Sequence, residues 1–469
     1  MGHFAMKKIK DPPNNKFRFI ALAAFTTFAL SAVVIYDPRY NWHNQQRISQ
    51  LTLIALCLSC LLAKTKEIQT HSPKLISIIF SFGLLSCSLS THSTWALKEW
   101  ALYLGLFSLA LGTYHLARRN RKIHEDASHI AFIIGFLLAT QFAIYYASAY
   151  ISKIQNLDPS LLFPGFDNPR FLAQFQTILI PLLASFYSSR KAGSAVLKRT
   201  ILATLSIHWC IAYTLGGRGF FAAIFLSNLY AILFFKFSTN LTKIQLKTAT
   251  LGLIIYYCLF KLPLLISGNV STENWGYSPL RTDLTGREAL WRLAWQNGIS
   301  HPIFGIGPMG LASSPNTIAA HPHQVILQWL AEWGAPATIA ICILILNTGY
   351  HYKIGLHQRT PEDQEKGIVI ALLGAMALAQ VDGVVVMPYI QTWLVLLAGL
   401  LMAKHFDKSE NSPTKKANYL IALYMAIALA IIMKIIFIEA PEVPSSEEHY
   451  YKTHIDGPRP RFWSQGWIK

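Results

Sequence analysis

The chain has 469 residues, of which 53% are hydrophobic, and its mean hydropathy is +0.35. This composition is too apolar for a soluble protein of that length. The formal charge of +18 could indicate a nucleic-acid partner, but the basic residues collect in particular loops, and that distribution excludes this class.

Apolar runs long enough to cross a bilayer recur along the whole chain. They predict an all-α polytopic integral membrane protein with about 12–14 transmembrane helices. The first run lacks a small-residue cleavage site, so we expect a retained helix and not a signal peptide. Residues 1–469 are expected to form a single integral membrane domain. The expected spans cover residues 20–36, 49–63, 75–90, 99–116, 127–151, 171–187, 200–215, 219–235, 248–266, 325–347, 367–380, 389–403 and 419–438.

Basic residues gather in alternate loops, which is the positive-inside pattern of cytoplasmic loops. The N-terminus is therefore expected in the cytoplasm. The loop at residues 268–324 and the short tail at 439–469 are expected on the outer, periplasmic side of a bacterial inner membrane. The basic clusters are Lys7, Lys8, Lys10 and Lys16; Arg118, Arg119, Arg121 and Lys122; Arg190, Lys191, Lys198 and Arg199; and Lys404, Lys408, Lys415 and Lys416.

All six cysteines fall inside expected spans, so the sequence predicts neither a disulfide framework nor a thiol metal site. No metal or other cofactor is expected, because the outer loops offer few carboxylates as partners for the histidines.

Three local patterns predict structure near the outer face. Gly334-Ala335-Pro336 is expected to break the tenth span, so that residues 324–333 form a short helix entering the membrane at an angle. Residues 288–299 suit a helix lying along the membrane surface. In the tail, Tyr450, Tyr451, Trp463 and Trp467 are expected to act as interfacial anchors.

Two arginines are candidate anion ligands. Arg218 lies in Gly216-Gly217-Arg218-Gly219, between two closely connected spans, where its planar donor fork suits phosphate oxygens. It could equally be a snorkelling side chain that anchors a helix end. Arg287 begins the expected surface helix, where the helix dipole also favours an anion, or it pairs with Glu288 or Asp283. Arg281 and Arg292 are interpreted as surface charges.

His321-Pro322-His323-Gln324 is the sharpest polar motif. A neutral His323 just before the tenth span suits a general base, whereas either histidine could simply be an interfacial side chain. Glu332 is expected to be buried, where it holds Arg218 or a histidine or bonds within the bundle.

Gly305-Ile306-Gly307-Pro308-Met309-Gly310 has the spacing of a dinucleotide-binding loop. No strand precedes it, and Pro308 removes an amide that a phosphate would need. We therefore interpret it as a tight turn in the outer loop.

Polar residues also occur at the outer ends of the sixth and eleventh spans. Arg170, Gln174 and Gln176 lie at the entry to the sixth span, where the amides could contact a sugar or pyrophosphate or join helices. Asp382 follows the eleventh span and is expected to act as a base or as a partner for an arginine.

Together, arginines, a histidine and an aspartate beside broken helices indicate group transfer from a lipid-linked pyrophosphate at the outer face. The arginines suit the pyrophosphate, the membrane setting suits its lipid, and the histidine suits deprotonation of an incoming hydroxyl.

The order of motifs resembles the O-antigen ligase superfamily of polytopic glycosyltransferases, which includes O-antigen ligases, O-antigen polymerases and bacterial O-linked protein oligosaccharyltransferases. The resemblance covers about residues 168–388. The motifs that carry it are Gly217-Arg218-Gly219, Gly286-Arg287 with Trp291, His301-Pro302-Ile303-Phe304-Gly305-Ile306-Gly307, His321-Pro322-His323-Gln324, Leu327-Gln328 and Glu332-Trp333-Gly334.

The resemblance implies a GT-C-like fold and inverting, metal-independent transfer of a glycan from undecaprenyl pyrophosphate. It implies that Arg218 and Arg287 hold the pyrophosphate and that His323 activates the acceptor hydroxyl. Asp382, from its position at the end of the eleventh span, is a second candidate catalytic residue. Arg170, Gln174, Gln176, His321 and Glu332 are further candidate substrate contacts. Gln324 departs from the Asn that often follows this histidine in the family.

The acceptor stays open at this point. Asn168-Pro169-Arg170-Phe171 and Val381-Asp382-Gly383 look more like the branch that glycosylates proteins such as type IV pilins at Ser or Thr. Lipid A core, as in O-antigen ligases, and a second lipid-linked glycan, as in polymerases, are the alternatives. A lipid-linked glycan transporter is the competing class, but it should carry ionisable groups near the midplane and repeated halves, which the sequence lacks.

Overall fold

The computed structural model describes residues 15–64, 72–154, 159–189, 193–262, 286–314, 316, 318–357, 359–405, 415–453 and 459–468. Within these ranges all regular elements are helical. Residues 268–285 of the expected outer loop, with Arg281 and Asp283, lie outside the described residues.

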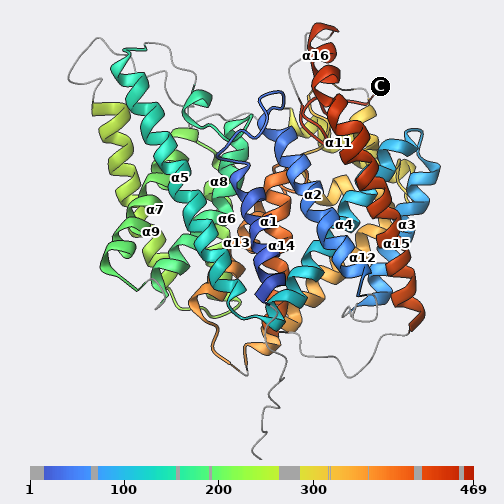
Figure 1. Cartoon of the computed structure of the whole chain (residues 1–469), viewed down its shortest axis with the longest axis horizontal. Helices are drawn as coiled ribbons and strands as arrows, with labels where there is room; N and C mark the ends of the chain where they lie inside the picture. The colour runs from blue at the N-terminus through green and yellow to red at the C-terminus, as the bar shows by residue number, and fades with distance from the viewer. Residues whose placement is uncertain are drawn as a thin grey trace, which may run out of the picture.

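Thirteen long helices of the described chain correspond one for one to the thirteen expected spans. Figure 1 shows them running side by side through one layer. We call the end of this layer that carries α11 (Arg287–Ser300) and α16 (Val443–Thr453) the upper end. The thirteen are α1 (Asn15–Leu30), α2 (Trp42–Leu62), α3 (Pro73–Leu89), α4 (Ser93–Arg119), α5 (Ile123–Ile151), α6 (Pro169–Ser188), α7 (Ala195–Leu215), α8 (Arg218–Leu233), α9 (Asn240–Tyr256), α12 (Val325–Gly355), α13 (Asp363–Leu378), α14 (Pro388–His405) and α15 (Lys415–Lys434).

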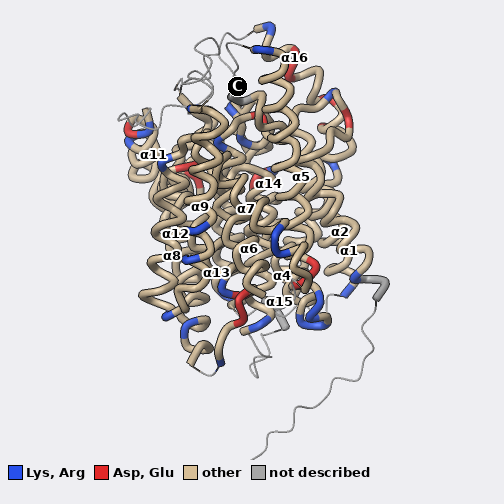
Figure 2. Tube along the Cα trace, turned by 90° about the vertical axis from the view of Figure 1, so that its left-hand side faces the viewer, with Lys and Arg blue, Asp and Glu red and all other residues tan. Residues whose placement is uncertain are grey.

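Of the described helices, six are long and apolar enough to cross a membrane by length and composition, and three more are shorter and apolar. Figure 2 shows long stretches of these helices without acidic or basic residues. The predicted class, an all-α protein that crosses the membrane several times, is confirmed.

The helices pack as two groups that meet around α13 and α14. On one side α7 packs on α9, and α13 packs on α6 and α8; on the other, α4 packs on α14 and α15, and α3 packs on α12. Figure 1 shows α6, α7, α8 and α9 in green and α13 in orange, with the second group in blue, orange and red. The upper ends of α6, α8 and α13 therefore lie together, next to α11 and the start of α12.

The predicted break in α12 is confirmed. Gly334 has the non-helical angles φ 79° and ψ 169°, so residues before and after it form two helical pieces. A break inside apolar surroundings leaves backbone groups without helical partners. Here the Ala335 N–H donates to the Pro302 carbonyl at 2.8 Å, and the Ile306 and Gly307 N–H groups donate to the carbonyls of Ala331 and Glu332 at 2.8 and 3.1 Å.

The geometry of the tight turn predicted at Gly305 to Gly310 requires glycine at two positions. Gly305 and Gly307 have positive φ angles of 67° and 95°. A Cβ at Gly305 would fall 2.6 Å from the Ala331 carbonyl oxygen, so only glycine lets this turn approach the broken helix. The turn therefore packs against the break in α12, and its N–H groups bind the carbonyl groups that the break leaves without helical partners.

The tail segment, residues 459–468, differs from expectation. Trp463 is only 2% exposed and donates its indole N–H to Glu439 at 2.6 Å, and Tyr450 is also buried. The expectation that these two are interfacial anchors is wrong, because Trp463 lies in the tail segment, which returns into the upper end of the bundle, and Tyr450 is on the buried side of α16. Tyr451 is exposed, as an anchor would be.

Candidate functional site

Three arginines from three different helices line one cavity of about 350 Å³ at the upper end. We call it the arginine cavity. Arg170 is the second residue of α6, Arg218 is the first residue of α8, and Arg287 is the first residue of α11. The positive ends of three helix dipoles and three guanidinium charges therefore meet at one place. Such an arrangement favours a ligand with several negative charges.

Local sequence determines where each of these helices begins. Asn168 caps α6 by accepting the Arg170 N–H at 2.9 Å. Gly216 ends α7 in the left-handed conformation with φ 60°, and α8 starts two residues later, which confirms the predicted close connection. Gly286, with φ 78°, precedes α11.

The arginine cavity also contains one acid, Asp382. Its described lining residues thus carry three guanidinium groups and one carboxylate, which leaves a net charge of +2. Burial lowers the pKa of Arg287; Asp382 opposes this shift, whereas the charges of Arg170 and Arg218 add to it. An anion in the cavity would relieve the repulsion between these cations.

Asp382 links the cavity to the predicted base. The Asp382 Oδ1 atom lies 3.5 Å from the Nδ1 atom of His323. Burial acts to raise the pKa of Asp382, but the His323 contact, the Gly383 N–H at 2.8 Å and the charge of Arg287 outweigh it and hold the pKa below its ordinary value. A carboxylate beside one ring nitrogen can orient an imidazole and stabilise the imidazolium that forms during proton transfer.

The loop that carries His323 is held from several sides. The Trp291 indole N–H donates to the Pro322 carbonyl at 3.0 Å, so α11 contacts the loop directly. The Val325 N–H donates to the Ala379 carbonyl at 3.0 Å, which joins the start of α12 to α13. His323 itself has φ 55°, a conformation that costs a residue other than glycine energy and that clusters at functional sites.

His321 lies beside His323 but does not line the arginine cavity. The two imidazole centroids are 4.3 Å apart. His321 is buried against Gly383, where an added Cβ would fall 2.3 Å from its Nε2 atom. Burial, followed by the neighbouring charges of His323 and Arg461, lowers the pKa of His321, so the ring is neutral at pH 7.

The two glutamines of α6 have different surroundings in the structure. Gln174 lines the arginine cavity, is fully buried, and has no hydrogen-bond partner on either amide atom. Gln176 instead donates to the His208 carbonyl at 2.8 Å on α7. Gln174 is thus placed to meet a ligand, whereas Gln176 joins two helices.

Glu332 does not contact Arg218 or a histidine. One carboxylate oxygen receives Arg461 of the tail segment at 2.5 Å, and the other accepts the Leu311 N–H at 3.1 Å. Arg461 also pairs with Glu99 of α4 at 2.9 Å. Neither Arg461 nor Glu99 was predicted, because no local pattern relates residues so far apart. An arginine next to the aromatic pair Phe462-Trp463 was the available signal.

Among the residues that the structure describes, no group of three or more His, Cys, Asp or Glu side chains is placed to hold a metal ion.

The fold and this site define a class: a multi-pass membrane protein with a cationic polar cavity at one end of its helices. Residues 176–342 match the family model of the O-antigen ligase, a segment that includes Arg218, Arg287, His323 and Glu332. Over this segment the chain is similar to the O-antigen ligase family, and the predicted resemblance is confirmed. No curated protein shows significant similarity to the chain.

Proposed function

We propose that the protein is an inverting oligosaccharyltransferase that moves a glycan from undecaprenyl pyrophosphate to an acceptor hydroxyl at the periplasmic face of the bacterial inner membrane. The observation that carries this proposal is the meeting of three arginines with the Asp382–His323 pair at one cavity. A pyrophosphate that links a lipid to a sugar carries two negative charges, which match the net charge of +2 on the described lining residues.

In the proposed reaction, His323 takes the proton of the acceptor hydroxyl, and the resulting oxygen attacks the anomeric carbon of the glycan. The bond from that carbon to the pyrophosphate oxygen breaks, and its electron pair leaves with the lipid pyrophosphate. Attack from the face opposite the leaving group inverts the anomeric centre. Arg218 and Arg287 stabilise the leaving charge, with Arg170 as a third cation.

The remaining residues have supporting roles in this proposal. Asp382 orients His323 and stabilises the imidazolium that forms. Gln174 offers an unpaired amide to the pyrophosphate or the first sugar. Gln176, His321 and Glu332 contact other protein groups, so their proposed role is to shape the site.

For the acceptor we propose Ser or Thr of a protein such as a type IV pilin, on the strength of the Asn168–Phe171 and Val381–Gly383 sequences. Transfer to lipid A core, as the family name would lead one to expect, is the alternative outcome, followed by polymerisation of the glycan. A transporter is disfavoured because the charged cavity lies at one end of the helices and not at their midplane.

The test is transfer in vitro by the purified protein from an undecaprenyl-pyrophosphate glycan, with EDTA present. A pilin-type protein, lipid A core and a second lipid-linked glycan are offered in parallel. Product is expected on the pilin-type protein, with loss of about 10²–10⁴-fold in the His323→Ala variant. His351→Ala, in the lower half of α12, is the matched control and should transfer normally.

Product on lipid A core alone would change the acceptor but keep the chemistry. If a donor of verified integrity gives no product with any acceptor, the proposed function is wrong. Separately, Arg218→Ala and Arg287→Ala should abolish transfer, and Arg→Lys at either position should restore part of it, because lysine keeps the charge but not the bidentate fork. Near-full activity in both alanine variants would show that Arg218 and Arg287 do not hold the pyrophosphate.

A further inference from the structure

The tail segment reaches the loop that carries the predicted base. Arg461 is only 1% exposed, and its guanidinium meets two buried carboxylates, Glu99 and Glu332. Its third contact is different in kind: the Nη1 atom donates to the Ala320 carbonyl at 2.8 Å. Ala320 directly precedes His321-Pro322-His323.

A second buried arginine fixes the tail segment in place. Arg47 of α2 donates to the carbonyls of Arg461 and Phe462, each at 2.9 Å. The same guanidinium donates to the Val386 carbonyl at 2.8 Å, four residues after Asp382. The loops of His323 and Asp382 are therefore both tied to the tail segment.

We propose that Arg461 is a positioning residue for the reaction: it holds the 320–323 loop so that His323 stays aligned with Asp382. This inference rests on the proposed function for its kinetic part. Its structural basis is that a charged donor, when buried, makes a strong bond to a carbonyl, while the two glutamates hold the donor at a fixed site. His323 has a left-handed backbone, a conformation that persists only when its surroundings enforce it.

Replacing Arg461 alone would leave two unpaired buried carboxylates and could unfold the protein. The test variant is therefore Glu99→Gln/Glu332→Gln/Arg461→Met, which removes all three charges together and keeps an acceptor for the Leu311 N–H. Replacement of a whole buried ionic cluster by neutral groups is often tolerated. Arg459→Gln in the same segment is the matched control.

Two measurements separate positioning from mere stability. Hydrogen exchange of the peptide that contains residues 319–325 should be faster in the folded triple variant than in the wild type, and this readout does not depend on activity. The rate constant kcat should fall about 10²-fold with little change in KM, because the base is misplaced while the donor site is intact. The Arg459→Gln control should resemble the wild type in both.

Wild-type exchange and wild-type kcat in the folded triple variant would overturn the inference. If the triple variant does not fold, the Arg461→Lys variant tests the proposal instead. Lysine keeps the charge near the glutamates but cannot reach all three partners, so a lower kcat is expected. An unchanged kcat would overturn the proposal. Inactive wild-type protein would contradict the proposed function instead. The hydrogen-exchange result would still test whether Arg461 holds the 320–323 loop.

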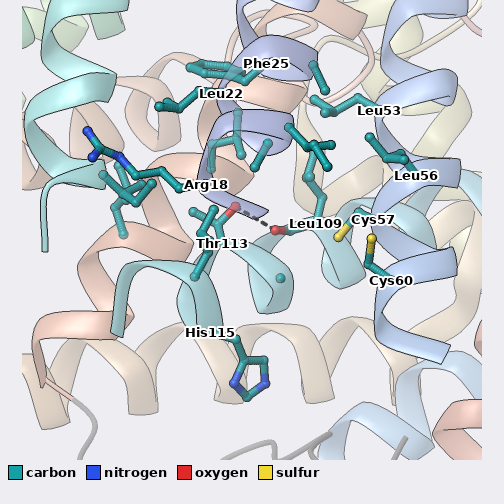
Figure 3. A pocket seen from close by; sticks show the side chains of 18 of the residues that line it. Arg18, Leu22, Phe25, Leu53, Leu56, Cys57, Cys60, Leu109, Thr113 and His115 are labelled. Atoms are coloured by element: carbon teal, nitrogen blue, oxygen red, sulfur yellow. Dashed lines mark hydrogen bonds between the residues drawn. The ribbon is translucent and has the colours of Figure 1, made fainter. Parts of the chain in front are cut away.

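The lower end of the bundle carries a separate groove. A groove of about 260 Å³ runs between α1, α2, α4 and α14. Figure 3 shows Leu22 and Phe25 of α1 near Leu53 and Leu56 of α2, with His115 of α4 farther down. Arg18, Lys64 and Arg119 also line the groove, but Arg18 is bound to Asp126 by two hydrogen bonds and Lys64 and Arg119 have interactions of their own, so the groove does not indicate a charged ligand.

Discussion

Asp382 and His323 belong to two different helix connections, 59 positions apart, yet the Oδ1 atom of one lies 3.5 Å from the Nδ1 atom of the other. The carboxylate also lines the arginine cavity. This single contact connects the cationic part of the site to the imidazole, so its removal should affect the chemistry more than the binding of a donor.

Asp382→Asn is therefore expected to lower kcat by about 10²–10⁴-fold while KM for the lipid-linked donor changes little. The amide has nearly the same shape but cannot stabilise an imidazolium. Initial rates at saturating acceptor measure both constants. Asp363→Asn, at the opposite end of α13, is the control; an equal loss of kcat there would assign the effect to general disturbance of the helix.

The pH dependence of stability offers a second test of Asp382. Its pKa in the folded protein is lower than the ordinary value of about 3.9. A group of this kind stabilises the fold above its unfolded pKa, and the contribution is lost as the pH falls through the folded pKa. The Asp382→Asn variant should therefore unfold at a lower temperature than the wild type at pH 5. This margin should shrink only below about pH 4. A margin that has already closed at pH 5 would contradict the shift.

Gly383→Ala should damage the site through His321. The added methyl would fall 2.3 Å from the His321 Nε2 atom, so either the ring or the Asp382 backbone must move. We expect a loss of about 1–3 kcal/mol in the free energy of unfolding, together with a lower kcat. Gly349→Ala in α12 is a suitable control because nothing lies within 4 Å of its added methyl. Thermal unfolding and transfer rates of the two variants test this; equal behaviour would exclude the steric mechanism.

The two glutamines of α6 should respond in opposite ways. Gln174→Leu removes an unpartnered cavity amide, so KM for the donor should rise while thermal stability is kept or improved. Gln176→Leu removes the bond to the His208 carbonyl and should cost about 1 kcal/mol of stability with a normal KM. The reverse pattern in KM and unfolding temperature would show that α6 is rotated relative to this structure.

The sequence was a good guide to elements that local patterns determine. Each expected span has its helix, because a long apolar run has few alternatives in a bilayer. The break at Gly334 followed from its Gly-Ala-Pro signal. Arg170, Arg218, Arg287 and Asp382 were identified singly from charge at span ends, and the structure brings them to one cavity.

Contacts between distant segments were beyond such reasoning. The choice between Gln174 and Gln176 depends on the rotation of α6, which is set by packing against α7 and α13. Glu332 was expected to hold Arg218 or a histidine or to bond within the bundle. Its partner Arg461 lies 129 positions later, in a segment interpreted as an interfacial tail. Aromatic composition alone cannot distinguish a buried segment from one at the membrane surface.

The bond between Arg461 and its two glutamates also imposes an order on biosynthesis. Glu99 and Glu332 precede Arg461 by 362 and 129 positions. During translation, both carboxylates are inserted before the guanidinium that neutralises them has been made. We therefore expect the 320–323 loop to reach its final position last, after the tail segment has left the ribosome and docked, so that nascent chains with all their spans in place do not yet hold His323 beside Asp382.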